Sequence, residues 1–126
     1  MLALDYGSAR CGCAVSDPTG TLATPIEAVN QPRAKPGLAR LTELVGELGV
    51  ERVVVGLPVG LSGDDTDQTR EARSFADALR SRLAVPVEMY DERFTTAIAS
   101  RSGGSDTSED SRAAAVLLED WLARNA

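Results

Sequence analysis

Short apolar runs separated by turn residues set the pattern of the amino-terminal part of the chain. Residues 1–5 predict a buried strand that ends on Asp5, and residues 11–16 predict a second strand beyond a tight turn that contains Gly7. A third strand is predicted for residues 21–29. Because the connections are short, we expect these strands to form an antiparallel meander.

Helical and strand patterns alternate in the rest of the chain. Pro32, Pro36 and Gly37 predict a loop, after which apolar residues recur at helical spacing over 38–48 until Gly49, a typical helix stop. The later patterns predict a strand over 52–57, a helix over 72–83, a strand over 85–90, a helix that begins within 95–100 and a helix over 110–122.

The order of these elements predicts an α/β fold. It gives a mixed five-stranded sheet, in which an antiparallel meander precedes parallel strands joined by right-handed crossovers. Helices then cover both faces of the sheet. This is the plan of the ribonuclease H-like fold, and we expect residues 1–126 to form a single domain of this kind.

Carboxylates stand where three of these elements end or begin. Asp5 ends the first strand, Asp91 and Glu92 close the last strand, and Asp110 opens the last helix, seven residues before Leu117 on its core-facing stripe. Converging oxygen ligands without nitrogen or sulfur suit Mg²⁺ or Mn²⁺. The chain has no histidine, which excludes a serine–histidine–aspartate triad and ordinary histidine-based zinc sites.

Each of these acids also has a structural interpretation. Asp5 could start the turn that follows its strand. The acids at 91–92 could pair with Arg93, and Asp110 could cap the last helix, where the helix dipole favours a negative charge. On residue spacing alone, both the metal-binding and the structural interpretations stay open.

Charge limits the kind of partner. The net charge of −6 argues against a broad nucleic-acid-binding surface, because affinity for phosphates is mostly electrostatic. Twelve of the 13 basic residues are arginines, whose forked guanidinium groups match phosphate oxygens. Arg10, across the turn from Asp5, could contact a phosphate or pair with a surface acid.

Cysteine usage and hydropathy predict a cytoplasmic protein. Cys11 and Cys13 lie two apart in a predicted strand, where a disulfide is geometrically unfavourable, so we expect buried, reduced thiols. No run is apolar enough to cross a membrane, and no signal-peptide pattern is visible.

Four ordered motifs, together spanning nearly the whole chain, resemble those of the YqgF/RuvX family. They are Leu4-Asp5-Tyr6-Gly7-Ser8-Ala9-Arg10-Cys11-Gly12-Cys13-Ala14-Val15-Ser16-Asp17, Val55-Gly56-Leu57-Pro58, Asp91-Glu92-Arg93-Phe94-Thr95-Thr96 and Asp110-Ser111-Arg112-Ala113-Ala114. The resemblance implies a ribonuclease H-like nuclease related to Holliday junction resolvases and linked to 5′-end maturation of pre-16S ribosomal RNA. It implies Asp5, Glu92 and Asp110 as catalytic and metal-ligating residues, with Glu92 rather than Asp91 as the ligand of that pair.

Two features depart from the family pattern. Gly60 and Ser62 stand where relatives often have asparagine and aspartate. Residues 98–109 form a short, acidic segment where relatives often have a longer, basic connection. A basic segment there would help to hold a phosphodiester backbone, so we expect the second departure to affect substrate affinity and substrate type but not the metal site.

We therefore expect a metal-dependent nuclease that uses a two-metal-ion mechanism with Mg²⁺ or Mn²⁺. Arg10 and Arg93 are secondary candidates for phosphate contact. The expected partner is RNA, or branched or single-stranded DNA, bound by a monomer or homodimer. One alternative is a Holliday junction resolvase-like DNA nuclease of recombination and repair, and another is a poorly catalytic RNA-binding module. A phosphotransferase of the actin-like kinase superfamily ranks last, because 126 residues leave no room for a second lobe.

Overall fold

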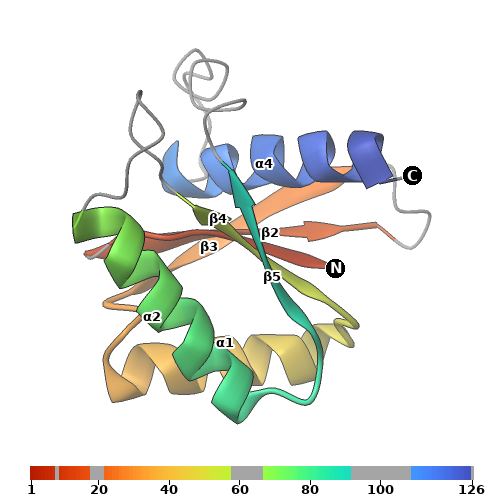
Figure 1. Cartoon of the computed structure of the whole chain (residues 1–126). Coiled ribbons are helices and arrows are strands. Elements are labelled where there is room, and N and C mark those ends of the chain that lie inside the picture. The colour runs from red at the N-terminus through yellow and green to blue at the C-terminus, as the bar shows by residue number, and fades with distance from the viewer. Residues whose placement is uncertain (8, 18–21, 58–66, 92–108, 126) are drawn as a thin grey trace.

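A computed structural model of the chain describes residues 1–7, 9–17, 22–57, 67–91 and 109–125. Five strands form one mixed sheet in the order β3-β2-β1-β4-β5 (Figure 1). The strands are β1 (Leu2–Asp5), β2 (Arg10–Ser16), β3 (Ala23–Asn30), β4 (Val53–Leu57) and β5 (Val87–Asp91). β2 pairs antiparallel with β1 and β3, whereas β4 pairs parallel with β1 and β5. The predicted meander followed by crossovers is therefore confirmed.

Helices cover both faces of this sheet. They are α1 (Lys35–Leu48), α2 (Asp67–Arg82) and α4 (Glu109–Asn125). Figure 1 shows α4 on one face and α1 and α2 on the other. The helix predicted to begin within 95–100 lies outside the described residues.

The start of α1 corrects the predicted loop over Pro36 and Gly37, because both residues belong to the first turn of the helix. Proline is tolerated there, since the first N–H groups of a helix have no intrahelical partner. A Cβ atom at Gly37 would lie 2.2 Å from the backbone oxygen of Gln31, so a glycine lets the helix start pack against the preceding loop. At the other end, Gly49 takes a left-handed φ of 63° and stops the helix, as predicted.

The core has two layers, one on each face of the sheet. Leu2 and Leu4 pack with the residues of α1 and α2, whereas Ala3 packs with α4, as expected for the alternation of a strand. Asp5 continues the series of Ala3, so it belongs to the α4 face. β1 thus ends with a carboxylate on the face that α4 covers.

Two further expectations concern the thiols and the hydropathy. Cys11 and Cys13 are fully buried free thiols, as predicted. Among the helices that the structure describes, none combines the length and the apolar character that a bilayer crossing requires.

Candidate functional site

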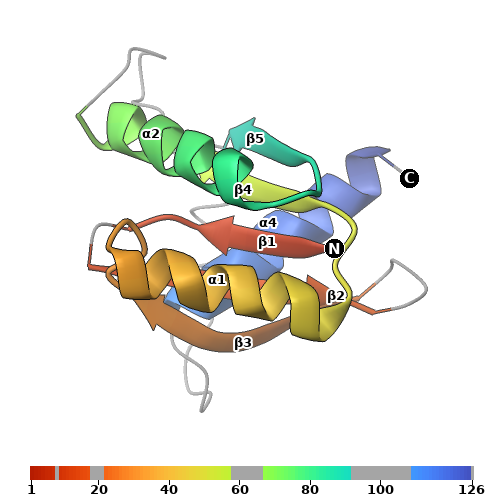
Figure 2. The same ribbon diagram turned by 90° about the horizontal axis from the view of Figure 1, so that it is seen from below.

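Most elements of the fold present an end at one edge of the sheet. β1, β4 and β5 run parallel, so their carboxyl ends lie at the same edge. α4 begins at this edge on one face of the sheet, and α1 and α2 begin there on the other face (Figures 1 and 2). In open α/β sheets this is the edge at which ligands bind.

Asp5 is the last residue of β1 and is half-buried at this edge. Its register partners are both glycines, Gly12 in β2 and Gly56 in β4. Cross-strand neighbours usually crowd a side chain on the same face, because their Cβ atoms lie about 4.5–5.5 Å apart. Because both register partners are glycines, neither of them places a side chain beside the Asp5 carboxylate.

The first turn of α4 is tied to the sheet next to Asp5. The Oγ atom of the fully buried Ser111 accepts a hydrogen bond from the backbone N–H of Cys13, at 3.2 Å. Cys13 adjoins Gly12, and the pairing of β2 with β3 shifts register between Cys11 and Cys13. The serine hydroxyl therefore ties the start of α4 to β2, next to the register partner of Asp5.

Asp110 precedes Ser111 in the first turn of α4, and its side chain lies outside the described residues. The predicted core-facing stripe of this helix is confirmed at Ala114 and Leu117, which are fully buried against the sheet. The backbone therefore brings position 110 to the edge and the face that carry Asp5.

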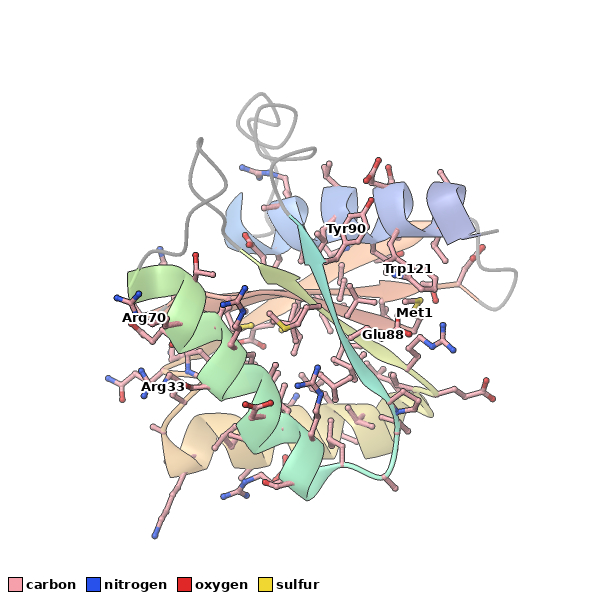
Figure 3. All side chains as sticks on the ribbon, viewed as in Figure 1. Met1, Arg33, Arg70, Glu88, Tyr90 and Trp121 are labelled. Carbon is pink, nitrogen blue, oxygen red and sulfur yellow. The ribbon has the colours of Figure 1, made fainter. Side chains whose placement is uncertain are left out.

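The end of β5 is hydrogen-bonded to the same helix. The hydroxyl of Tyr90 donates a hydrogen bond to the Oδ2 atom of Asp120 in α4. Two residues earlier, Glu88 pairs with Arg52 at 3.7 Å, and the Arg52 guanidinium lies 5.6 Å from the ring centroid of Trp121 (Figure 3). Positions 88 and 90 of β5 therefore face α4.

The predicted ligand Glu92 and the predicted phosphate contact Arg93 lie outside the described residues. Position 92 has the same parity in the sequence as positions 88 and 90. Asp91 is the last residue of β5, in register with Leu57.

A second cluster lies at this edge on the α1 and α2 side. Tyr6, directly after Asp5, is buried, and its ring centroid lies 4.8 Å from that of Phe75. Its hydroxyl donates a hydrogen bond to the Oε1 atom of Glu71 at 2.7 Å, and the same oxygen pairs with Arg33 at 3.3 Å. Burial first, and then the hydrogen bond and charge of Glu71, raise the pKa of Tyr6 to about 12. The phenol therefore remains a proton donor at neutral pH.

Sequence reasoning missed this cluster. Its residues come from the end of a strand, a loop and the first turns of α2, and Tyr6 and Glu71 are 65 residues apart. No periodicity or motif connects such positions. The one available signal was the aromatic residue that follows Asp5.

The turn that joins β1 to β2 depends on Gly7. A Cβ atom there would lie 2.6 Å from the backbone oxygen of Arg10. Arg10 itself is exposed and begins β2 opposite Asn30. Arg10 lies two residues before Gly12 in the same strand, so both positions belong to the face that α4 covers. This candidate phosphate contact therefore lies at the same edge and on the same face as Asp5.

The predicted ligand atoms are of the type that binds a hard divalent ion. Asp5 and the residues predicted to join it offer carboxylate oxygens, which Mg²⁺ and Mn²⁺ prefer. Within the part of the chain that the structure describes, no group of three or more histidine, cysteine or acidic side chains is gathered closely enough to hold a metal. Of the three predicted ligands, Asp5 is the one whose side chain the structure describes.

Comparison with known proteins connects this arrangement to one family. The family model RuvX, described as Holliday junction resolvase, matches residues 1–124. The "Putative pre-16S rRNA nuclease" of Mycobacterium leprae (strain TN) is 45% identical over 96% of this chain and 71% of its own length. The protein of the same name from Chloroflexus aurantiacus (strain ATCC 29366 / DSM 635 / J-10-fl) is 39% identical over 97% of this chain and 85% of its own length.

Solved structures agree with the fold. Thermus thermophilus RuvC superposes with a TM-score of 0.58 at 18% identity, covering 98% of this chain and 96% of RuvC. The same protein in complex with a Holliday junction substrate gives a TM-score of 0.60 at 18% identity, covering 98% and 95%. The likeness confirms the predicted ribonuclease H-like fold. Together with the family match and the identity to the relatives, the four ordered motifs lead to one conclusion: the chain belongs to the RuvX family.

Proposed function

We propose that this protein is a divalent-metal-dependent nuclease that hydrolyses phosphodiester bonds in the 5′-end processing of pre-16S ribosomal RNA. The observation that carries the proposal is the hydrogen bond from the Cys13 N–H to Ser111, which ties the start of α4 to the strand beside Asp5. The name of the relatives, which are 39–45% identical, supports the choice of RNA. Because ribosomal RNA is processed where it is made, we also propose a cytoplasmic location.

Asp5, Glu92 and Asp110 are the proposed metal ligands. Asp5 ends β1 on the α4 face, and position 110 lies in the first turn of the helix that covers this face. Glu92 is proposed over Asp91 because position 92 is two residues after Tyr90, which faces α4, and side chains alternate between the faces of a strand. When bound, Mg²⁺ or Mn²⁺ would activate water and neutralise the charge on the leaving oxygen.

The residues around Asp5 would let a phosphodiester approach closely. Gly12 and Gly56 flank Asp5 on the neighbouring strands without side chains. Arg10, exposed on the same face, would contact a phosphate oxygen through its guanidinium fork. Arg93 is proposed for the same role from its motif.

A Holliday junction is the second candidate substrate. The family description names Holliday junction resolvase, and the RuvC structure that superposes with a TM-score of 0.60 holds such a junction. A resolvase cuts two strands symmetrically, so for this substrate we propose that the protein acts as a homodimer. For RNA processing, either a monomer or a homodimer is compatible.

A cleavage assay on a panel of substrates tests the proposal. The purified protein is incubated with Mn²⁺ or Mg²⁺ and with a single-stranded RNA that carries the 5′ precursor of 16S RNA, a single-stranded DNA or a four-way DNA junction. We expect metal-dependent cleavage of the RNA that EDTA abolishes. Preferential cleavage of the junction would favour the second candidate, and cleavage of none of the substrates would contradict the nuclease proposal.

A further inference from the structure

A locally basic surface lies at the same edge as Asp5, on the opposite side of the sheet from α4. The segments 31–37 and 67–73, at the starts of α1 and α2, carry four basic residues and two acidic residues, although the chain as a whole has a net charge of −6. Arg33 pairs with Glu71, which directly follows Arg70 in α2, and Figure 3 shows both arginines at the end of the sheet where α1 and α2 begin. This surface therefore departs in sign from the rest of the protein.

Glu71 is the acid of this surface whose side chain the structure describes, and its neighbours engage it. Its Oε1 atom accepts the hydrogen bond of Tyr6 at 2.7 Å and pairs with Arg33 at 3.3 Å. The Arg33 side chain nevertheless stays 52% exposed. Glu71 thus holds Arg33 in place while the guanidinium remains accessible to a ligand in solvent. Arg70, at the preceding position of α2, is exposed as well.

The surface adjoins the proposed cleavage centre. Tyr6 directly follows Asp5, and one residue of extended chain spans about 3.3 Å. A hollow between the β1–β2 turn and the starts of α1 and α2 is lined by Tyr6, Ala9, Gln31, Arg33, Ala34 and Glu71. A strand bound at Asp5 on one face of the sheet would meet this hollow as soon as it passed over the edge.

We propose that Arg33 and Arg70 form a docking surface for the sugar–phosphate backbone of the substrate strand, beyond the nucleotides that contact Asp5. The inference rests on the proposed function and extends it by naming where the strand leaves the cleavage centre. Arginine is suited to this role because its planar fork matches phosphate oxygens. Contacts of this kind position a strand without reading its sequence. Arg33 and Arg70 are therefore positioning residues.

Binding without metal separates this proposal from catalysis. The affinity of a fluorescent single-stranded RNA is measured by anisotropy in EDTA, from low salt upwards, for the wild type and the Arg33→Gln/Arg70→Gln double variant. Each phosphate contact to a single strand contributes about 0.7 to the slope of log K against log salt. We expect the double variant to lose about 1.4 from this slope, with weaker binding at low salt.

Arg82→Gln combined with Arg52→Gln is the matched control. Both arginines are exposed, and Arg82 lies in the last turn of α2, about 18 Å along the helix from Arg70. The control variant changes the net charge by the same amount and should keep the wild-type slope. Arg70→Gln alone, with an expected loss of about 0.7, serves if the double variant does not fold.

Kinetics gives a second readout. In the cleavage assay the Arg33→Gln/Arg70→Gln variant should have a higher KM than the wild type and a similar kcat at saturating RNA. The reason is that the replaced residues contact the strand at a distance from the scissile bond. Equal slopes for this variant and the control would overturn the docking surface, even if the wild type cleaves RNA. RNA binding that depends on Arg33 and Arg70 without any cleavage would overturn the nuclease proposal and support the surface.

Discussion

The Oγ atom of Ser111 accepts a hydrogen bond from the backbone N–H of Cys13, although the two residues are 98 positions apart. Both are fully buried, so neither group can turn to water instead. The contact sets the start of α4 one residue along β2 from the partner of Asp5. It therefore places the start of the last helix of the chain close to the end of the first strand, which carries Asp5.

Replacing Ser111 with alanine should weaken this connection. The Cys13 N–H would stay buried without its acceptor, which costs about 1–3 kcal/mol of unfolding free energy. Urea denaturation measures the loss. Ser81→Ala is the matched control, since the Ser81 hydroxyl donates to the Ala78 oxygen on the surface of α2. If both variants are equally stable, the contact does not anchor α4.

Gly7→Ala should distort the turn that follows Asp5. The added methyl group would lie 2.6 Å from the backbone oxygen of Arg10, so the chain must move. We expect a loss of about 1–3 kcal/mol and reduced cleavage. Gly46→Ala, in the interior of α1, would meet no atom within 4 Å of its Cβ among the described residues and should stabilise the protein by up to about 1 kcal/mol. A Gly7→Ala protein with wild-type stability would contradict the packing of this turn.

The contact between Tyr6 and Glu71 predicts an alkaline transition. The pKa of Tyr6 is raised from 10.0 to about 12 in the folded protein, so its contribution to stability is complete below pH 10 and is lost as the pH rises to about 12. Tyr6→Phe should lower stability at neutral pH by about 1 kcal/mol, and its difference from the wild type should shrink across that interval. Denaturation in EDTA at several pH values measures the difference, and tyrosinate absorbance locates the pKa. Ionisation of Tyr6 near pH 10 in the folded protein would refute the assignment.

The sequence allowed most of the fold to be predicted, because the informative signals were local. The apolar run that ends on Asp5 and the helix stop at Gly49 depend on the chain immediately around them. The loop predicted over Pro36 and Gly37 was wrong because a first helical turn accepts residues that a helix interior rejects.

The candidate site was less accessible to sequence reasoning. The bond between Cys13 and Ser111 and the cluster of Tyr6, Glu71 and Arg33 join residues that no periodicity relates. The motif resemblance predicted Asp5, and the structure places it at a strand end on the α4 face. The roles of Glu92, Arg93 and the Asp110 side chain remain predictions, as does the single domain over 1–126.

The central claim is that Asp5 belongs to a divalent-metal site, and thermal unfolding with and without Mn²⁺ tests it most directly. In EDTA, Asp5→Asn should be as stable as the wild type or more stable by about 1 kcal/mol, because it would relieve repulsion among the carboxylates proposed to share the metal site. Added Mn²⁺ should raise the melting temperature of the wild type and of the control Asp77→Asn, whose carboxylate pairs with Arg80 on the surface, but not that of Asp5→Asn. Cleavage should be lost in Asp5→Asn alone. An Asp5→Asn protein that melts lower in EDTA and keeps the wild-type response to Mn²⁺ would contradict the account.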